Sequence, residues 1–113
     1  MDASTQLIDT IEEYEQIISQ QEAVLFYYSS ISCGVAEALE PKVRRLIQEK
    51  FPKINYHLIN LPFSKKICAA HSVFVEPTIL VYFNGKESIR KSRNISTLDL
   101  EKSIARLYKI FFE

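Results

Sequence analysis

The stretch of sequence that decides the fold runs from Val24 to Ala36 and reads VLFYYSSISCGVA. It starts inside an uninterrupted apolar run, 23–28, that is typical of a strand buried on both faces. Behind it, residues 34–51 carry an apolar stripe at helical spacing, made by Val35, Leu39, Val43, Leu46 and Ile47. The pattern therefore predicts a buried strand that leads through a short loop, containing Cys33, into a long helix.

Strands and helices alternate along the rest of the chain. Thr10 and Glu13 form a capping box in front of a helix, and Asn84-Gly85 is typical of a type I′ hairpin turn. The other predicted elements are a short strand at 6–8, a helix at 11–20, a strand at 54–60, a helix at 64–72, strands at 78–83 and 87–91, and a helix at 97–111. On the last helix we expect a buried side made by Leu100, Ile104, Leu107, Tyr108 and Phe111. The order β-α-β-α-β-α-β-β-α predicts an α/β fold with a mixed sheet, as one domain over residues 1–113.

Composition narrows the class of protein. The chain has 113 residues, 47% of them hydrophobic and 25% charged, which is ordinary for one globular domain and excludes a disordered chain. The longest apolar run is far shorter than the roughly 18 residues that a membrane span requires, and no secretory signal is visible. The two cysteines, Cys33 and Cys68, cannot form a disulfide framework. We therefore expect a cytoplasmic protein with reduced thiols, and no membrane partner.

Charge is balanced overall but uneven along the chain. Residues 1–41 hold eight acidic and no basic residues, whereas the remainder holds 14 basic and six acidic residues. The simpler interpretation is that an acidic part folds against a basic part; the alternative is a surface for anions or nucleic acid. No nucleic-acid-binding signature is present, so we predict no nucleic-acid partner. The basic residues of the predicted hairpin and the loop after it could form an anion site or simply block pairing at a sheet edge; they are Lys86, Arg90, Lys91 and Arg93.

The residues and their order resemble the thioredoxin family over essentially the whole chain. Ser32-Cys33-Gly34-Val35-Ala36 stands where the family has Trp-Cys-Gly-Pro-Cys, and Glu76-Pro77-Thr78 stands where it has Ile-cisPro-Thr. Pro41 matches the proline that bends the family's second helix, and Asn84-Gly85 matches its hairpin turn. The resemblance implies the thioredoxin fold, a central mixed β-sheet flanked by helices, with a cis-proline beside the reactive cysteine.

Several departures from the family pattern fall on the site that the resemblance implies. Ala36 replaces the second cysteine, so the internal disulfide cannot form. Tyr27 stands in place of the buried acid that assists the second thiol, and Val35 in place of the proline between the cysteines. Ser32 replaces an aromatic residue, Glu76 an aliphatic one, and Arg93 a glycine. The resemblance therefore implies a thioredoxin-like protein with one thiol at the reactive position.

The predicted site follows from this resemblance. Cys33 is the candidate catalytic residue, and the candidate substrate-binding residues are Ser32, Gly34, Val35, Ala36, Glu76, Pro77 and Arg93. A helix N-terminus favours the Cys33 thiolate, whereas Glu37, Glu40 and Glu76 disfavour it, so the direction of its pKa shift stays open. We expect Cys68 to be a core residue. Cys68 and His71 have the spacing of half a zinc site, but other ligands are lacking, and we expect neither a metal nor a cofactor.

Two functions remain open from the sequence. The first is monothiol thiol–disulfide exchange through a mixed disulfide, with protein or small-molecule thiols and disulfides as partners. The alternative is a non-catalytic adaptor that binds peptides in the cis-proline groove, with Glu76 and Arg93 selecting the partner's charge. Neither the substrate nor the oligomeric state can be inferred.

Overall fold

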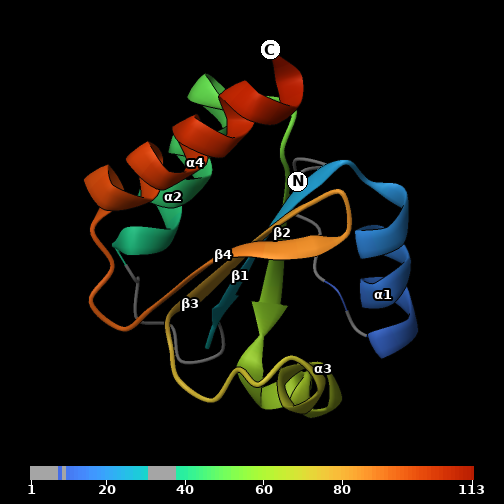
Figure 1. Ribbon diagram of the computed structural model, residues 1–113. Coiled ribbons are helices and arrows are strands. Elements are labelled where there is room, and N and C mark those ends of the chain that lie inside the picture. The colour runs from blue at the N-terminus through green and yellow to red at the C-terminus, as the bar shows by residue number, and fades with distance from the viewer. Residues whose placement is uncertain (1–7, 9, 31–37) are drawn as a thin grey trace.

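The computed structural model describes residue 8 and residues 10–30 and 38–113. Helices and strands alternate along these residues up to a final β-hairpin and helix (Figure 1). The elements are α1 (Ile11–Gln20), β1 (Ala23–Ser29), α2 (Leu39–Lys50), β2 (Asn55–Asn60), the short 3-10 helix η2 (Leu61–Phe63), α3 (Lys65–Ala70), β3 (Thr78–Phe83), β4 (Lys86–Ser92) and α4 (Thr97–Phe112).

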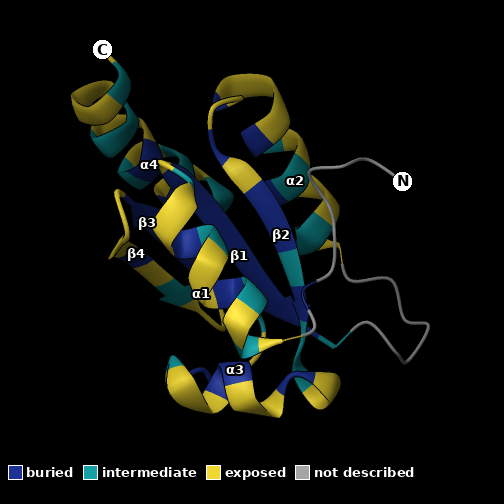
Figure 2. Cartoon of the chain, turned by 90° about the vertical axis from the view of Figure 1, so that its right-hand side faces the viewer, coloured by how far each residue is buried: buried dark blue, intermediate teal, exposed yellow. Residues whose placement is uncertain are grey.

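The four described strands form one mixed sheet in the order β2-β1-β3-β4. β1 runs parallel to β2 and antiparallel to β3, and β3 and β4 form an antiparallel hairpin. Asn84 and Gly85 have φ values of 53° and 79°, as the predicted type I′ turn requires. β1 lies inside the sheet and is buried along its whole length (Figure 2), which explains its unbroken apolar sequence.

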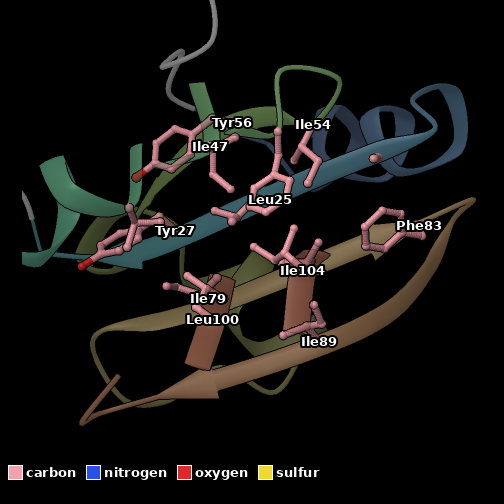
Figure 3. Packing of buried hydrophobic residues seen from close by; sticks show 14 residues of the cluster. Leu25, Tyr27, Ile47, Ile54, Tyr56, Ile79, Phe83, Ile89, Leu100 and Ile104 are labelled. Carbon is pink, nitrogen blue, oxygen red and sulfur yellow. The ribbon is translucent and has the colours of Figure 1, made fainter. Parts of the chain in front are cut away.

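Helices cover both faces of the sheet and create two cores. Alternate residues of β1 point to opposite faces, with Leu25 on one side and Phe26 on the other. Leu25 and Tyr27 pack with Ile47 of α2 and Ile104 of α4, as Figure 3 shows. On the other face lie α1 and α3. The chain thus has the mixed sheet flanked by helices that the sequence predicted.

Three expectations about individual elements need comment. The predicted first strand lies outside the described residues except for Ile8, which is buried and donates its N–H to the Leu58 carbonyl at 3.4 Å. Residues 34–37 of the predicted second helix also lie outside them. α2 is described from Leu39, so Pro41 lies in the first turn of the described helix. The expectation that Phe111 is buried was wrong. Its ring stacks on Phe83, but the residue is 41% exposed because it lies in the last turn of α4.

Candidate functional site

One end of the sheet gathers the described residues of the predicted site. β1 ends at Ser29, β3 begins at Thr78, and β4 ends at Ser92, and the sheet register places these ends side by side. The candidate residues Ser32, Cys33, Gly34, Val35 and Ala36 lie outside the described residues. They belong to the segment that joins Ser30 to the start of α2. The described partners in this site are therefore Glu76, Pro77 and Arg93.

Backbone contacts hold the loops on either side of Pro77. The Glu76–Pro77 peptide bond is cis. The Arg93 N–H donates to the Pro77 carbonyl at 2.9 Å, and the Thr78 hydroxyl donates to the Val75 carbonyl at 2.7 Å. Arg93 has a φ of 66°, a left-handed conformation that favours glycine, the residue that the resemblance places here. The structure thus brings Pro77 and Arg93 together through their backbones.

Glu76 is tied to the strand that leads into the Cys33 segment. Its carboxylate accepts a hydrogen bond from the Ser30 N–H at 2.6 Å, although the residue as a whole is exposed. A charge-assisted bond of this kind is stronger than a neutral one and fixes the carboxylate in place. Sequence reasoning placed Glu76 near the site but missed this bond, because it joins residues 46 positions apart.

Glu40, which was expected to disfavour a Cys33 thiolate, has partners of its own. Its carboxylate lies 3.3 Å from Arg44 Nε and accepts a hydrogen bond from the Tyr56 hydroxyl at 2.7 Å. Burial, and then this contact with Glu40, raises the pKa of the Tyr56 phenol. Arg44, which lies one helical turn further along α2, therefore compensates part of the charge of this carboxylate.

Tyr27 occupies the buried position where the resemblance places an acid. It is fully buried and belongs to the core between the sheet and helices α2 and α4 (Figure 3). A phenol there offers a hydroxyl group instead of a carboxyl group. The core beneath the site therefore lacks, at this position, the group that assists a second thiol in the family.

Cys68 is a core residue, as expected. It lies in α3, is 7% exposed, and packs in the cluster with Tyr28 and Ile67. Burial raises the pKa of its thiol. Because the thiolate is the nucleophilic form, Cys68 is a poor candidate for thiol chemistry at neutral pH.

Two hollows flank the Glu76–Pro77 bond. The first, of about 480 Å³, is lined by residues that include Ser30, Leu61, Cys68, Phe74 and Glu76. Phe74 is 76% exposed, so a large apolar side chain is accessible at the wall of this hollow. The second, of about 570 Å³, lies between Leu39 and residues 93–96, with Pro77 in its wall. The Glu76 carboxylate therefore lies at the first hollow, and the Arg93 guanidinium lies at the second.

His71 is engaged away from this site. Its Nε2 lies 2.8 Å from a Glu15 carboxylate oxygen, and its Nδ1 lies 3.1 Å from the Tyr82 hydroxyl. Both ring nitrogens therefore have partners, and neither is Cys68. Among the described residues no group of three or more His, Cys, Asp or Glu side chains is placed to hold a metal ion. No helix in the described part of the chain has the length and apolarity to cross a membrane.

Comparison with known proteins identifies relatives over most of the chain. The family model described as Thioredoxin matches residues 5–106. The thioredoxin-like protein YdfQ of Bacillus subtilis is 27% identical over 104 residues, which cover 92% of each chain. Thioredoxin-1 of Saccharomyces cerevisiae is 23% identical over 78 residues, covering 69% of this chain and 75% of that protein.

Solved structures share the fold. The oxidized form of mitochondrial thioredoxin 3 from Saccharomyces cerevisiae superimposes with a TM-score of 0.79 at 20% identity, covering 91% of this chain and 95% of that one. A thioredoxin from Plasmodium falciparum superimposes with a TM-score of 0.73 at 17% identity, covering 95% and 99%. At this identity the likeness concerns the fold alone.

Proposed function

The chain belongs to the thioredoxin family, whose general function is thiol–disulfide redox chemistry, and we propose that it performs this chemistry with the single thiol of Cys33. In this proposal residues 1–113 act as one thioredoxin-like domain in the cytoplasm, where glutathione supplies an external thiol. The partners are protein or small-molecule thiols and disulfides. The domain is a monothiol exchanger, and it is not an efficient two-thiol reductase.

The proposed exchange has two steps that balance in atoms and electrons. The Cys33 thiolate attacks one sulfur of a partner disulfide; a bond forms between Cys33 Sγ and that sulfur, the partner's S–S bond breaks, and the released thiolate takes up a proton. An external thiolate then attacks the partner sulfur of the mixed disulfide, forms a new disulfide with it, and returns Cys33 as a thiolate. One disulfide is exchanged for another, with no net oxidation.

One observation carries the proposal: the loops around Pro77 are held by hydrogen bonds, whereas the second thiol of the family pattern is missing. Pro77 and Arg93 are joined through their backbones, and Glu76 binds the end of β1 just before the Cys33 segment. Ala36 has no sulfur, and Cys68 is buried with a raised pKa. Cys33 is therefore the thiol that we assign to the chemistry.

The first test separates the two cysteines. A peptide carrying glutathione in a mixed disulfide is mixed with the protein and reduced glutathione, and release of the free peptide is followed by chromatography. Cys33→Ser should abolish the catalysed release, and Cys68→Ser, checked for folding by circular dichroism, should retain it. Release that survives in Cys33→Ser would refute the assignment.

A second test concerns the charge of Glu76. Glu76→Gln keeps an oxygen that can accept from the Ser30 N–H but removes the negative charge. We expect the pH midpoint of Cys33 alkylation to move to lower pH in this variant, because a nearby carboxylate disfavours a thiolate. An unchanged midpoint would mean that Glu76 acts only by holding the loop.

A second candidate function, a non-catalytic adaptor, is favoured by the hollow beside Glu76 and its exposed Phe74. An extended peptide could bind there and at Pro77 without any thiol chemistry. A wild-type protein that forms no mixed disulfide, yet binds peptides in a way that Phe74→Ala weakens, would support this function over the first.

A further inference from the structure

A basic groove lies between the outer strand of the described sheet and the C-terminal helix. It has a volume of about 340 Å³ and is lined by residues 88–91 of β4 and by Ser103, Arg106 and Leu107 of α4. In Figure 1 these elements are the orange strand and the red helix. The described residues that line the groove include no carboxylate. The groove runs along the sheet edge, and its residue Lys91 pairs with Ile79, two residues after Pro77.

Lys91 and Arg106 give the groove its charge. Ile89 is buried against Leu100 and Ile104, and Lys91, two residues further along β4, points to the same face of the sheet. Neither Lys91 nor Arg106 forms an ion pair with another residue in the described ranges. Arg90 is different, because it binds Glu87 and donates to the carbonyls of His71 and Ser72.

The basic surface continues along α4 beyond the groove. Lys102 and Lys109 lie about one turn before and after Arg106, and all three are exposed. The acidic helix α1 does not neutralise them, since it packs on the opposite face of the sheet beside α3. The three glutamates of α1 are therefore not the acidic residues that lie against α4.

The other feature of the groove is an open strand edge. Among the described strands β4 pairs only with β3, so alternate backbone N–H and C=O groups of β4 point outward. Positive side chains at such an edge repel an incoming strand that carries positive charge, and they attract an incoming strand that carries negative charge.

We propose that this groove binds an extended acidic segment of a partner protein. The segment adds to the outer edge of β4 as a further strand, and its carboxylates pair with Lys91 and Arg106. A peptide is favoured over other polyanions because the groove combines unpaired positive charge with open backbone donors and acceptors. The site does not use Cys33, so it stands independently of the proposed exchange chemistry.

The test uses a fluorescein-labelled dodecapeptide of alternating Glu and Val, titrated with the full chain and followed by fluorescence anisotropy. We expect saturable binding that weakens as salt is added. The double variant Lys91→Glu, Arg106→Glu should weaken binding about tenfold or more, because two favourable pairs become repulsive. Lys42→Glu, which reverses an exposed charge on α2, is the matched control and should change the affinity less than about twofold.

A second arm tests the added strand. Two further peptides are tested, one methylated on the backbone nitrogens of all Val residues and the other on those of all Glu residues. One of the two should lose binding, because methylation removes the N–H groups that would otherwise donate to β4. Equal binding by both methylated peptides would overturn strand addition. Absence of saturable binding, equal weakening by Lys42→Glu, or equally tight binding of a single-stranded RNA or of anionic phospholipid vesicles would overturn the proposal of an acidic peptide site.

Discussion

The two faces of the sheet are held to their helices by different balances of interaction: apolar packing dominates on the α2 and α4 face, where the Tyr56 hydroxyl adds a bond to Glu40, and a connected polar network is present on the other face. On the α2 and α4 face, the buried core is mainly aliphatic and includes Leu25, Ile47, Leu100 and Ile104 (Figure 3). On the α1 and α3 face, three tyrosine hydroxyls and an imidazole lie within the packed region. Apolar packing has little directional preference, whereas hydrogen bonds hold their partners in one arrangement.

The polar network joins four elements of the α1 and α3 face. The Tyr14 and Tyr28 hydroxyls share a hydrogen bond, and the Tyr14 ring stacks on Phe26 with the ring centroids 4.0 Å apart. His71 follows α3, and its ring lies 4.4 Å from the Tyr14 ring and binds Glu15 and Tyr82. The network therefore fixes α3, and with it Cys68 and one wall of the hollow beside Glu76. We therefore expect the loss of a buried hydroxyl group to lower the free energy of unfolding more on the α1 and α3 face than on the α2 and α4 face.

Ile104→Ala should have the largest effect. Ile104 is fully buried in the aliphatic core, so the substitution removes apolar contacts and leaves a cavity, at a cost of about 2–5 kcal/mol. Urea unfolding followed by circular dichroism measures the loss. A loss below about 1 kcal/mol would mean that apolar packing does not dominate this face.

Tyr14→Phe should have the next largest effect. It keeps the ring but removes the hydroxyl, leaving buried Tyr28 without that partner, and we expect a loss of about 1–2 kcal/mol. Tyr108→Phe is the matched control on the other face, where the half-buried hydroxyl accepts only an exposed bond from the Lys53 N–H. Equal losses in the two variants would erase the distinction between the faces.

Alkaline pH should destabilise the fold through buried tyrosines on both faces of the sheet, with Tyr56 on the α2 and α4 face and the others on the α1 and α3 face. Burial raises the pKa of Tyr14, Tyr28 and Tyr82, whereas tyrosines in the unfolded chain ionise near pH 10. Because the folded-state pKa is raised, this stabilisation is complete below about pH 10 and is lost as the pH rises. At pH 11 Tyr14 and Tyr28 should each lower the free energy of unfolding by about 1.4 kcal/mol, and Tyr82 should lower it in the same direction.

Tyr82→Phe tests this pH dependence. The free energy of unfolding should fall less between pH 8 and pH 11 in the variant than in the wild type, by at most about 1.4 kcal/mol, which is the free energy of ionising one unfolded tyrosine at pH 11. The measurement is urea unfolding of both proteins at the two pH values. An identical fall would contradict the raised pKa of Tyr82.

Glu87→Gln should have the smallest effect. The hydrogen bonds from Arg90 lower the pKa of Glu87, and Arg90 in turn holds the carbonyls that follow α3. The pair is partly exposed, so we expect a loss of only about 0.2–0.5 kcal/mol at pH 7. Since the folded-state pKa is lowered, the difference from the wild type should shrink as the pH falls below about 4. A difference that is unchanged at pH 3 would contradict this account.

Much of the fold could be predicted because its signals are local. The Thr10 capping box, the apolar run of β1 and the Asn84-Gly85 turn each specify an element through neighbouring residues, and all three elements formed as expected. The position of Pro77 beside Arg93 followed from the family pattern, because that pattern encodes which loops meet.

The contacts that the sequence did not predict join distant residues. The bonds from Ser30 to Glu76 and from His71 to Glu15 cross 46 and 56 positions, and they depend on how the strands and helices pack. The pair of Glu40 and Arg44 joins residues only one turn apart, and helical spacing allows such a pair without requiring it. Periodicity reports which side of a helix is buried, but not which polar groups meet across the core.

The most direct test of the single-thiol account is intact-protein mass spectrometry after treatment of the folded wild-type chain with glutathione disulfide. The account predicts one glutathione per chain, located on Cys33 by peptide mapping, and its complete removal by reduced glutathione. An adduct on Cys68 alone, or an internal disulfide between Cys33 and Cys68, would contradict it.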